Sequence, residues 1–410
     1  MRRKTPRLLL LTGTAPRPDG VGGIILHDLI AALPAGQCTV AVTAENAVEL
    51  CAEAPDWHPI AVGHPRLAAS RWGRIGRLAR WPLLRMAHWR AVSTAVARCV
   101  DIARTEGVDE VWAVLDSPAT IEIALPVAKA LGKPLRVTVW DDVEHNIDYF
   151  GIDRWTGSRL RSRFAEVCRA AASLAVIGET MQAEYLRRYG KRGVVVRHGA
   201  DAAPSTASRP DDDPGVRIGF AGSVSARSAF ECLLKALDQV DWSIQGRPVT
   251  LVLMGGRFDI WSRRPRRIEV LGWRSVEETV RILSGCTITY LPQAFEASWR
   301  PFSEWSFPSK LTTYLAAGAP ILLHAPEYAS LPGYQERRQF ARVCHWLDVE
   351  ELVLALTELA TNPKKREMVQ SEAREALGQD FSKRRFVESF YEFLQVDPEC
   401  IDAVNVCKAA

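Results

Sequence analysis

Apolar residues along this chain form short runs that alternate with longer segments of helical period. Residues 7–11, 39–43 and 108–115 are continuous enough in apolar character to predict strands buried on both faces. Residues 24–33 and 121–131 instead repeat apolar positions at the spacing of a helix. Further strands are expected at 135–140, 173–178, 250–254, 268–272, 287–291 and 321–323, with two more opening at Val194 and Val216. Strands that alternate with helices in this way predict a doubly wound α/β fold with parallel sheets.

Residues 202–214 interrupt this pattern with a stretch rich in proline, serine, alanine and aspartate, which is the composition of a linker. The alternation of strands and helices restarts after the linker. We therefore expect an N-terminal domain at 1–201, the linker at 202–214, a C-terminal domain at 215–380, a final helix at 381–396 and a tail at 397–410.

The segment at 307–323 combines a loop, a short helix and a buried strand. Pro308 suits the opening of a helix, Ser309 is placed to cap it, and Gly318 is placed to end it. A helix N-terminus carries unpaired N–H donors and a partial positive charge, and Lys310 adds a full charge beside it. The segment therefore predicts either a phosphate site or a helix start that only packs, with Lys310 in solvent.

Polar residues follow several predicted strands at their carboxyl ends, which is where ligands gather in open α/β sheets. Asp116 follows the strand at 108–115, and Asp141 and Asp142 follow the strand at 135–140. Gly22 and Gly23 lie between the first strand and the first helix, where glycine permits either the close approach of a ligand or simple turn geometry. For Asp142 above all, capping of the following helix is the competing interpretation.

Residues 71–90 hold six arginines and three tryptophans and no acidic residue. Wound as a helix, this stretch gathers tryptophan and leucine on one face and arginine on the other, and Pro82 is expected to break it and start a second helix. The pattern predicts either a helix in an anionic membrane interface or a helix whose apolar face packs on the core. The residues expected to face the membrane are Trp72, Arg74, Arg77, Arg80 and Trp81.

Charge, cysteine content and the lengths of the apolar runs argue against several classes of protein. A net charge of +4, from 52 basic and 48 acidic residues, is too small to argue for a nucleic-acid partner. Nine cysteines without a Cys-x-x-Cys pair favour reduced thiols in a cytosolic protein and argue against a zinc site. The apolar run at 8–11 is too short for a signal peptide, and no run approaches the length of a bilayer crossing. We therefore expect at most peripheral contact with a membrane.

The pattern P-S-K-L-x-x-Y-L-A-A-G-x-P at 308–320, followed by an apolar strand, resembles the donor-binding segment of the group 1 (family 4) retaining glycosyltransferases. The resemblance implies the GT-B fold, in which two Rossmann-like domains face each other across a cleft and a last helix crosses back to the first domain. It also implies a nucleotide-sugar as a substrate, with no cofactor and no metal. In that family this helix start faces the donor diphosphate. Thr313 stands where a glutamate usually holds the ribose, and Trp305 stands at the register of a second acidic residue, with Glu304 one place off.

The resemblance extends more diffusely over residues 7–390. Ser223 stands at the usual arginine position of a diphosphate-binding pair, and Arg227 lies one residue short of the usual lysine position, where Ser228 stands. Trp140 and Asp141 resemble a strand end that usually carries histidine and aspartate. The residues assigned to the donor are Gly22, Gly23, Gly222, Ser223, Arg227, Trp273, Ser309, Lys310, Leu311 and Thr313. Asp141 is the candidate catalytic residue, and Asp116, Asp142 and His145 are assigned to the acceptor side.

The resemblance predicts an enzyme that transfers a sugar from a nucleotide-sugar to an acceptor hydroxyl with retention. Together with the basic stretch at 71–90, it points to cell-surface polysaccharide or glycolipid synthesis at the inner face of the cytoplasmic membrane, with a sugar or lipid-linked sugar as acceptor. A non-hydrolysing nucleotide-sugar 2-epimerase remains an alternative. So does a non-catalytic GT-B subunit that binds a glycosyltransferase or a membrane, because Trp305, Thr313 and Ser223 replace the usual donor-binding groups.

Overall fold

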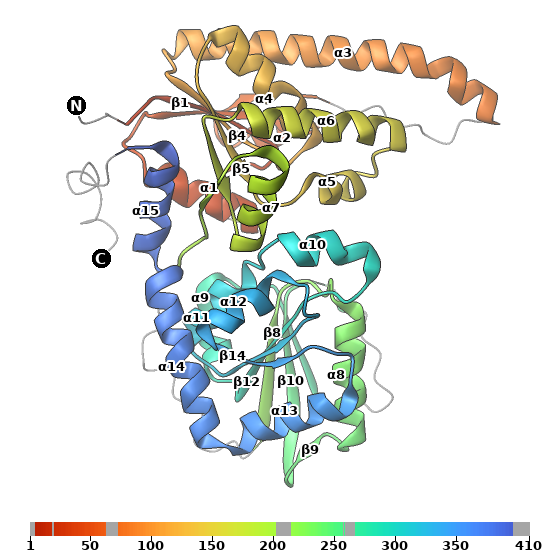
Figure 1. The fold of residues 1–410 in the computed structure, drawn as a ribbon, viewed down its shortest axis with the longest axis vertical. Helices are drawn as coiled ribbons and strands as arrows, with labels where there is room; N and C mark the ends of the chain where they lie inside the picture. Colours follow the sequence, from red (N-terminus) through yellow and green to blue (C-terminus); the bar gives the residue numbers. More distant parts are fainter. Residues whose placement is uncertain are drawn as a thin grey trace. The chain divides into compact units, whose positions relative to one another are not determined.

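Two parallel β-sheets form the cores of this protein, one in each of two units (Figure 1). Residues 1–196 with 387–410 make up the N-terminal unit, and residues 197–386 make up the C-terminal unit. The computed structural model describes residues 5–18, 20–62, 73–201, 215–256, 258 and 267–396, without the side chains of 73–81. The predicted linker at 202–214 and tail at 397–410 lie outside these residues.

The sheet of the N-terminal unit has the strand order β3-β2-β1-β4-β5-β6-β7, with every neighbouring pair parallel. The four leucines that open β1 are fully buried, which explains the uninterrupted apolar run there. The strands are β1 (Leu8–Thr12), β2 (Cys38–Val42), β3 (His58–Pro59), β4 (Glu110–Val114), β5 (Leu135–Val139), β6 (Ser173–Val176) and β7 (Val194–Val195).

Helices flank this sheet, and α3 packs on α4, which packs in turn on α6 (Figure 1). The helices are α1 (Val21–Ala31), α2 (Ala47–Leu50), α3 (Gly73–Thr105), α4 (Pro118–Leu131), α5 (Val143–Tyr149), α6 (Arg154–Ala170) and α7 (Glu179–Tyr189). The predicted break at Pro82 is wrong, because α3 continues through that residue. Pro82 is exposed, so water can hydrate the carbonyl group that loses its N–H partner.

The last helix, α15 (Lys383–Leu394), begins in the C-terminal unit and ends in the N-terminal unit. Its Phe390 ring packs on the buried Trp112, with ring centroids 5.1 Å apart. The carbonyl oxygen of Phe393 accepts a 2.8 Å hydrogen bond from Arg136, whose guanidinium also pairs with the buried Glu110. The hydroxyl group of Tyr391 donates to the carbonyl of Ala32 at 2.8 Å. These contacts make the end of α15 part of the N-terminal core.

The sheet of the C-terminal unit repeats the same arrangement in the order β11-β10-β8-β12-β13-β14, and the short β9 pairs antiparallel with β10. Apolar residues of β8, β10, β12, α8 and α13 form its core. The strands are β8 (Val216–Ala221), β9 (Ser243–Ile244), β10 (Arg247–Met254), β11 (Ile268–Gly272), β12 (Ile288–Pro292), β13 (Ile321–His324) and β14 (Ala341–Cys344). The helices are α8 (Arg227–Gln239), α9 (Val276–Ser284), α10 (Arg300–Trp305), α11 (Lys310–Ala317), α12 (Ser330–Arg338), α13 (Val349–Thr361) and α14 (Pro363–Asp380), with a 3₁₀ turn at Ala297–Trp299.

The predicted fold class, two doubly wound α/β domains with parallel sheets, is confirmed by these two sheets. Within the described ranges, no helix combines the length and apolar composition that a bilayer crossing requires. In the same ranges, no group of three or more His, Cys, Asp and Glu side chains is arranged to hold a metal ion.

Candidate functional site

Lys310 lies at the carboxyl end of β8, where its ammonium group is held by two contacts. Its Nζ donates a 2.8 Å hydrogen bond to the carbonyl of Ser223 and lies 4.6 Å from the centre of the Phe220 ring. Burial lowers the pKa of this ammonium group to about 8. A half-buried cation at the start of a helix and the end of a strand is suited to binding an anion, because both the charge and the helix dipole favour it.

Glycines at the strand ends make room for this lysine. Gly222 has φ +114°, and a β-carbon built on it would lie 2.5 Å from Lys310 Cε. Gly255, with φ +138°, packs its backbone against Gly222, since a β-carbon there would lie 2.5 Å from the Gly222 carbonyl oxygen. The turns after β8 and β10 therefore stack directly on each other, and the lysine stem covers the first of them.

Tyr314 fixes the orientation of α11 relative to the sheet. Its buried hydroxyl accepts a 2.9 Å hydrogen bond from the N–H of Ala221 and donates to the carbonyl of Tyr290 at 3.2 Å. Residues four apart lie on the same face of a helix, so this anchor also aims Lys310 at the sheet. At the other end of α11, Gly318 adopts the left-handed conformation (φ +69°) expected for a glycine stop.

The predicted capping role of Ser309 is wrong, because its side chain makes no capping hydrogen bond to the described residues. Its backbone is already helical (φ −58°, ψ −24°), whereas a capping serine needs extended geometry. The N–H groups of Leu311 and Thr312 bond instead to the carbonyls of Pro308 and Ser309. Leu311 is fully buried, so its side chain packs in the core, and the half-buried Thr313 lies two residues further along α11.

Arg227 and Trp273 are exposed. The side chain of Arg227 is 77% exposed, and its guanidinium pairs with Glu231 one turn along α8, at 3.2 Å. Trp273 follows the end of β11 and is 73% exposed. Glu296, which the sequence reasoning did not single out, accepts a hydrogen bond from the N–H of Ser228 in the first turn of α8. It lies in a loop without hydrophobic periodicity, so no signal in the sequence marked it.

In the N-terminal unit, Asp116 ties together the loops that follow β1 and β4. Its carboxylate accepts from the N–H groups of Gly13 (2.7 Å) and Thr14 (2.9 Å) and from the hydroxyl of Thr12 (3.0 Å). Burial raises its pKa, and these hydrogen bonds oppose the shift. These hydrogen bonds fix the backbone at the carboxyl ends of β1 and β4, and they leave little of the carboxylate to bind an acceptor directly.

The space beside Gly22 and Gly23, the two glycines assigned to the donor, is filled by protein atoms. A β-carbon on Gly22 would lie 3.0 Å from the ring of Trp140, and one on Gly23 would lie 2.8 Å from the carbonyl of Arg17. Both glycines belong to the first turn of α1. In this structure they permit close packing, which favours the turn-geometry interpretation of the loop.

Asp142 is the buried N-cap of α5. One carboxylate oxygen accepts from the N–H of Glu144 (3.2 Å), and the other accepts from the hydroxyl of Tyr185 (3.1 Å) and from Arg188 (3.2 Å). Burial raises its pKa, and Arg188 opposes that shift. These contacts favour the capping interpretation, in which Asp142 holds the segment after β5 against α7.

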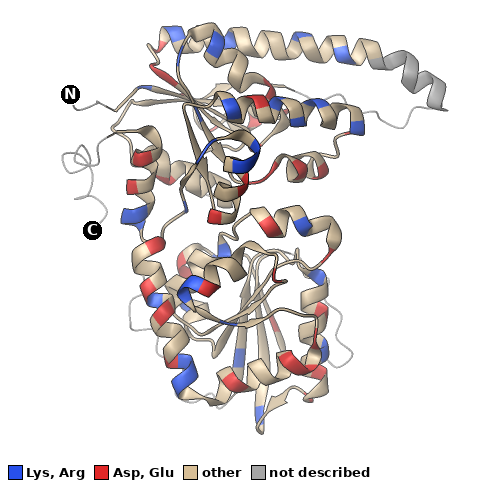
Figure 2. Cartoon of the chain, in the orientation of Figure 1, with Lys and Arg blue, Asp and Glu red and all other residues tan. Residues whose placement is uncertain are grey.

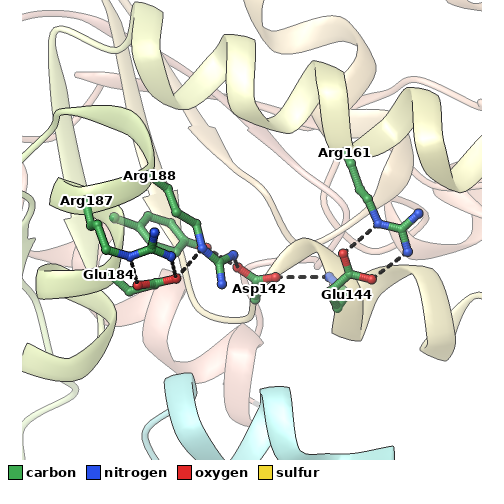
Figure 3. A network of polar contacts seen from close by, with 7 residues as sticks. Asp142, Glu144, Arg161, Glu184, Arg187 and Arg188 are labelled. Carbon is green, nitrogen blue, oxygen red and sulfur yellow. Dashed lines mark hydrogen bonds and ion pairs between the residues drawn. The ribbon is translucent and has the colours of Figure 1, made fainter.

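A network of ion pairs and hydrogen bonds connects Asp142 with residues of α5, α6 and α7 (Figure 3). Within α7, Glu184 pairs with both Arg188 and Arg187. Arg161 of α6 donates two hydrogen bonds of 2.6 Å to the carboxylate of Glu144 in α5. The sequence reasoning missed this network. Its only signal was the adjacent arginine pair near the end of the helix after the strand at 173–178.

Asp141 and His145 lie on either side of this anchor. Asp141 is half-buried and follows Trp140, whose ring packs on the start of α1. His145 is half-buried in α5 and stacks on the exposed Tyr149, with ring centroids 5.9 Å apart. The structure therefore places Asp141, Asp142 and His145 within one short segment, with Asp142 turned inward.

Solved structures with the same architecture cover almost the whole chain. One is Alr3699/HepE of Anabaena in complex with UDP and glucose, at 16% identity over 95% of this chain and 99% of that chain, with a TM-score of 0.64. The chain has the GT-B fold. Sucrose-phosphate synthase from Thermosynechococcus elongatus matches at 14% identity over 95% and 98% of the two chains, with a TM-score of 0.64.

A third GT-B structure, of trehalose-6-phosphate synthase, matches at 12% identity over 95% of this chain and 99% of that chain, with a TM-score of 0.59. No model of a protein family matches the sequence, and no curated protein does so either. At such identities the similarity establishes the fold alone.

Proposed function

We propose that this protein is a glycosyltransferase that moves a sugar from a nucleotide-sugar to an acceptor hydroxyl with retention. The observation that carries the proposal is the Lys310 ammonium, held beside the start of α11 and the turn after β8. Departure of a nucleoside diphosphate builds negative charge on its phosphate oxygens. A fixed cation and helix N–H groups stabilise that charge without having to reorganise.

Proteins of the same fold lend support. Alr3699/HepE has been solved with UDP-glucose, and the structure of trehalose-6-phosphate synthase concerns glycosyl transfer with retention. On this proposal the nucleotide-sugar is a substrate, and no cofactor or metal takes part. In the N-terminal unit, Asp141 orients the acceptor hydroxyl, and Asp142 is a positioning residue that holds the segment carrying it.

We further propose that the acceptor is a lipid-linked sugar, reached from the cytoplasmic face of a membrane in cell-surface polysaccharide or glycolipid synthesis. In the described part of α3, Leu83, Met86 and Trp89 are 63%, 47% and 60% exposed. A spacing of three residues keeps them within about one third of the helix circumference. Basic residues and no acidic ones accompany them from Pro82 to Val100 (Figure 2). Trp72 and the side chains of Arg74, Arg77, Arg80 and Trp81 lie outside the described residues.

The decisive experiment for the donor is calorimetric titration with UDP, GDP, ADP and TDP and with their glucose derivatives. We expect one nucleotide to bind, and its nucleotide-sugar to release nucleotide faster when a lipid extract is added. The anomeric configuration of the product, read by NMR, tests retention. Conversion of the nucleotide-sugar without acceptor would support a 2-epimerase, and the absence of any nucleotide binding would support a non-catalytic subunit.

Asp141→Asn tests the acceptor side. If Asp141 orients the acceptor, the variant should lose turnover while its melting temperature and its nucleotide affinity stay close to those of the wild type. A loss of melting temperature in proportion to the loss of activity would instead show that Asp141 has a structural role.

Sedimentation with anionic liposomes tests the membrane proposal. Each basic residue near an anionic surface contributes about 1 kcal/mol, so binding should be strong at low salt and fall steeply as salt rises. Leu83→Ser and the triple change of Arg74, Arg77 and Arg80 to Glu should each weaken it. Leu354→Ser is the matched control, because Leu354 is 68% exposed in the C-terminal unit. A wild-type protein that stays in the supernatant at low salt makes a soluble acceptor the better proposal.

A further inference from the structure

Near the start of α8, two buried oxygen atoms have no hydrogen-bond partner among the described residues. They are Oγ of Ser228 and Oε2 of Glu296. Across the described residues, only one other buried side-chain oxygen or nitrogen atom shares this property, Oε1 of Gln37 in the N-terminal unit. Buried polar atoms are nearly always paired, so two such atoms on contacting residues call for an explanation.

The position of the Glu296 carboxylate is fixed by the protein. Its Oε1 accepts a 2.9 Å hydrogen bond from the N–H of Ser228, in the first turn of α8. Ala226 and Ala229 of that turn pack against Ala294, and Phe295 packs against the same cluster. The loop after β12 is thereby docked on α8, and the second carboxylate oxygen is held in place without a donor from the described part of the chain.

The chemistry of the pair favours a hydroxyl group as the missing partner. Glu296 Oε2 needs a donor, because a buried acceptor that stays unpaired loses the hydrogen bonds it would make with water. Ser228 Oγ can donate as well as accept. A ligand hydroxyl can donate to Glu296 and accept from Ser228 at the same time, whereas a phosphate oxygen would be repelled by the carboxylate.

The segment from Ser223 to Ser228 connects the Lys310 ammonium with the pair formed by Glu296 and Ser228. The ammonium of Lys310 contacts the carbonyl of Ser223, and Glu296 caps the helix at Ser228. A fully extended chain between those two residues spans at most about 17 Å. A nucleotide-sugar whose diphosphate lies at Lys310 thus carries its sugar hydroxyls within the range of this loop.

We propose that Glu296 and Ser228 bind a hydroxyl group of the sugar carried by the nucleotide donor, and so help to select which sugar is transferred. This inference rests on the proposed glycosyltransferase function, since it requires a nucleotide-sugar at Lys310. It adds a sugar-recognition role to residues whose visible contact only caps a helix.

The test compares the affinity for a nucleoside diphosphate with that for the matching nucleotide-sugar, by calorimetry. Glu296→Gln keeps an oxygen to cap α8 but lacks the charge, and Ser228→Ala removes the hydroxyl. We expect each variant to bind the nucleoside diphosphate as the wild type does and to lose about tenfold in affinity for the nucleotide-sugar. Glu375→Gln is the control, because Glu375 pairs with Arg338 at the surface of the C-terminal unit, and it should change neither affinity.

The outcomes separate the two proposals. If the wild type binds a nucleoside diphosphate and both variants bind the nucleotide-sugar unchanged, the pair holds water or caps the helix only, and this inference is overturned while the proposed function stands. If the wild type binds no nucleotide at all, both fall. Thermal unfolding shows whether Glu296→Gln keeps the hydrogen bond that caps α8. If Glu296→Gln is unstable, the affinities of Ser228→Ala decide whether the pair binds the sugar.

Discussion

The side chain of Lys310 occupies the space that a β-carbon at Gly222 would fill, with Cε only 2.5 Å from that position. The lysine and the glycine therefore depend on each other. The lysine reaches the carbonyl of Ser223 because the strand end beside it has no side chain, and the turn at Gly222 has φ +114°, which other residues rarely adopt.

Gly222→Ala should therefore displace Lys310 as well as strain the turn. We expect a loss of about 1–3 kcal/mol in stability from the backbone conformation, together with weaker nucleotide binding. Gly256→Ala is the control, since a β-carbon at Gly256 meets no atom of the described residues within 4 Å. Thermal unfolding and calorimetry on both variants measure the two effects. Equal nucleotide affinity in the two folded variants would show that the position of Lys310 does not matter for binding.

Lys310→Ala should weaken nucleotide binding by about 1.5–3 kcal/mol, or roughly 10- to 150-fold, the range for a hydrogen bond to a charged group. Lys364→Ala, which removes an exposed lysine from α14, should have no such effect. Unchanged affinity in a folded Lys310→Ala protein would contradict the assignment of the diphosphate to this place.

The pH dependence of binding follows from the lowered pKa of Lys310. Burial lowers that pKa to about 8, and a bound diphosphate should raise it again by favouring the charged form. Affinity should therefore fall as pH rises above about 8, and binding there should take up protons from the buffer. Lys310→Arg stays charged and should abolish the fall. Calorimetry in buffers of different ionisation enthalpy measures the proton uptake, and its absence would contradict this role.

Arg188 and Arg187 should differ sharply in their contribution to stability, although they are adjacent. Arg188 pairs with the buried carboxylate of Asp142, and removing one partner of a buried pair costs about 3–5 kcal/mol. Arg187 is highly exposed and pairs with Glu184 only, among the residues of this network (Figure 3). Arg188→Met should thus lower the melting temperature clearly, and Arg187→Met should barely change it. Equal effects would show that the network does not anchor α5 to α7.

Acid should destabilise the C-terminal unit through His324. The ring is fully buried, with Nε2 2.8 Å from the carbonyl of Trp346 and Nδ1 2.7 Å from the hydroxyl of Tyr290, and burial lowers its pKa from 6.5 to about 4. Between these values the unfolded chain binds more protons than the folded one. The contribution of neutral His324 to the free energy of unfolding is therefore complete above pH 6.5. It is lost as pH falls towards 4, by up to about 3 kcal/mol. His324→Gln should flatten this dependence in denaturant unfolding, and an unchanged slope would contradict it.

Sequence reasoning succeeded where the signal is local. The apolar run of β1, the glycine stop of α11 and the placing of Asp116 and Asp141 at strand ends all depend on neighbouring residues and on the general geometry of parallel sheets. Pro82 is the exception, because its effect on a helix depends on whether the freed carbonyl can be hydrated.

The contacts that define the candidate sites are long-range, and for this reason sequence reasoning did not predict them. Lys310 meets Ser223 across 87 positions, Glu296 meets Ser228 across 68, and Arg188 meets Asp142 across 46. A spacing pattern does not contain such pairs. Arg227 pairs with Glu231 on the same helix, and its assignment to the donor stays a prediction.

The return of the chain into the N-terminal unit sets the order in which that unit can be completed during synthesis. Arg136 and Glu110 emerge from the ribosome early, but the carbonyl of Phe393 that Arg136 bonds follows 257 positions later. At about 5–20 residues per second, the gap lasts roughly 13–50 s. Until then the Trp112 ring also lacks the Phe390 ring that packs on it. A gene fragment that stops at Val196 would encode a sheet whose last packing element is missing, whereas a circular permutant that begins at α15 would supply that element first.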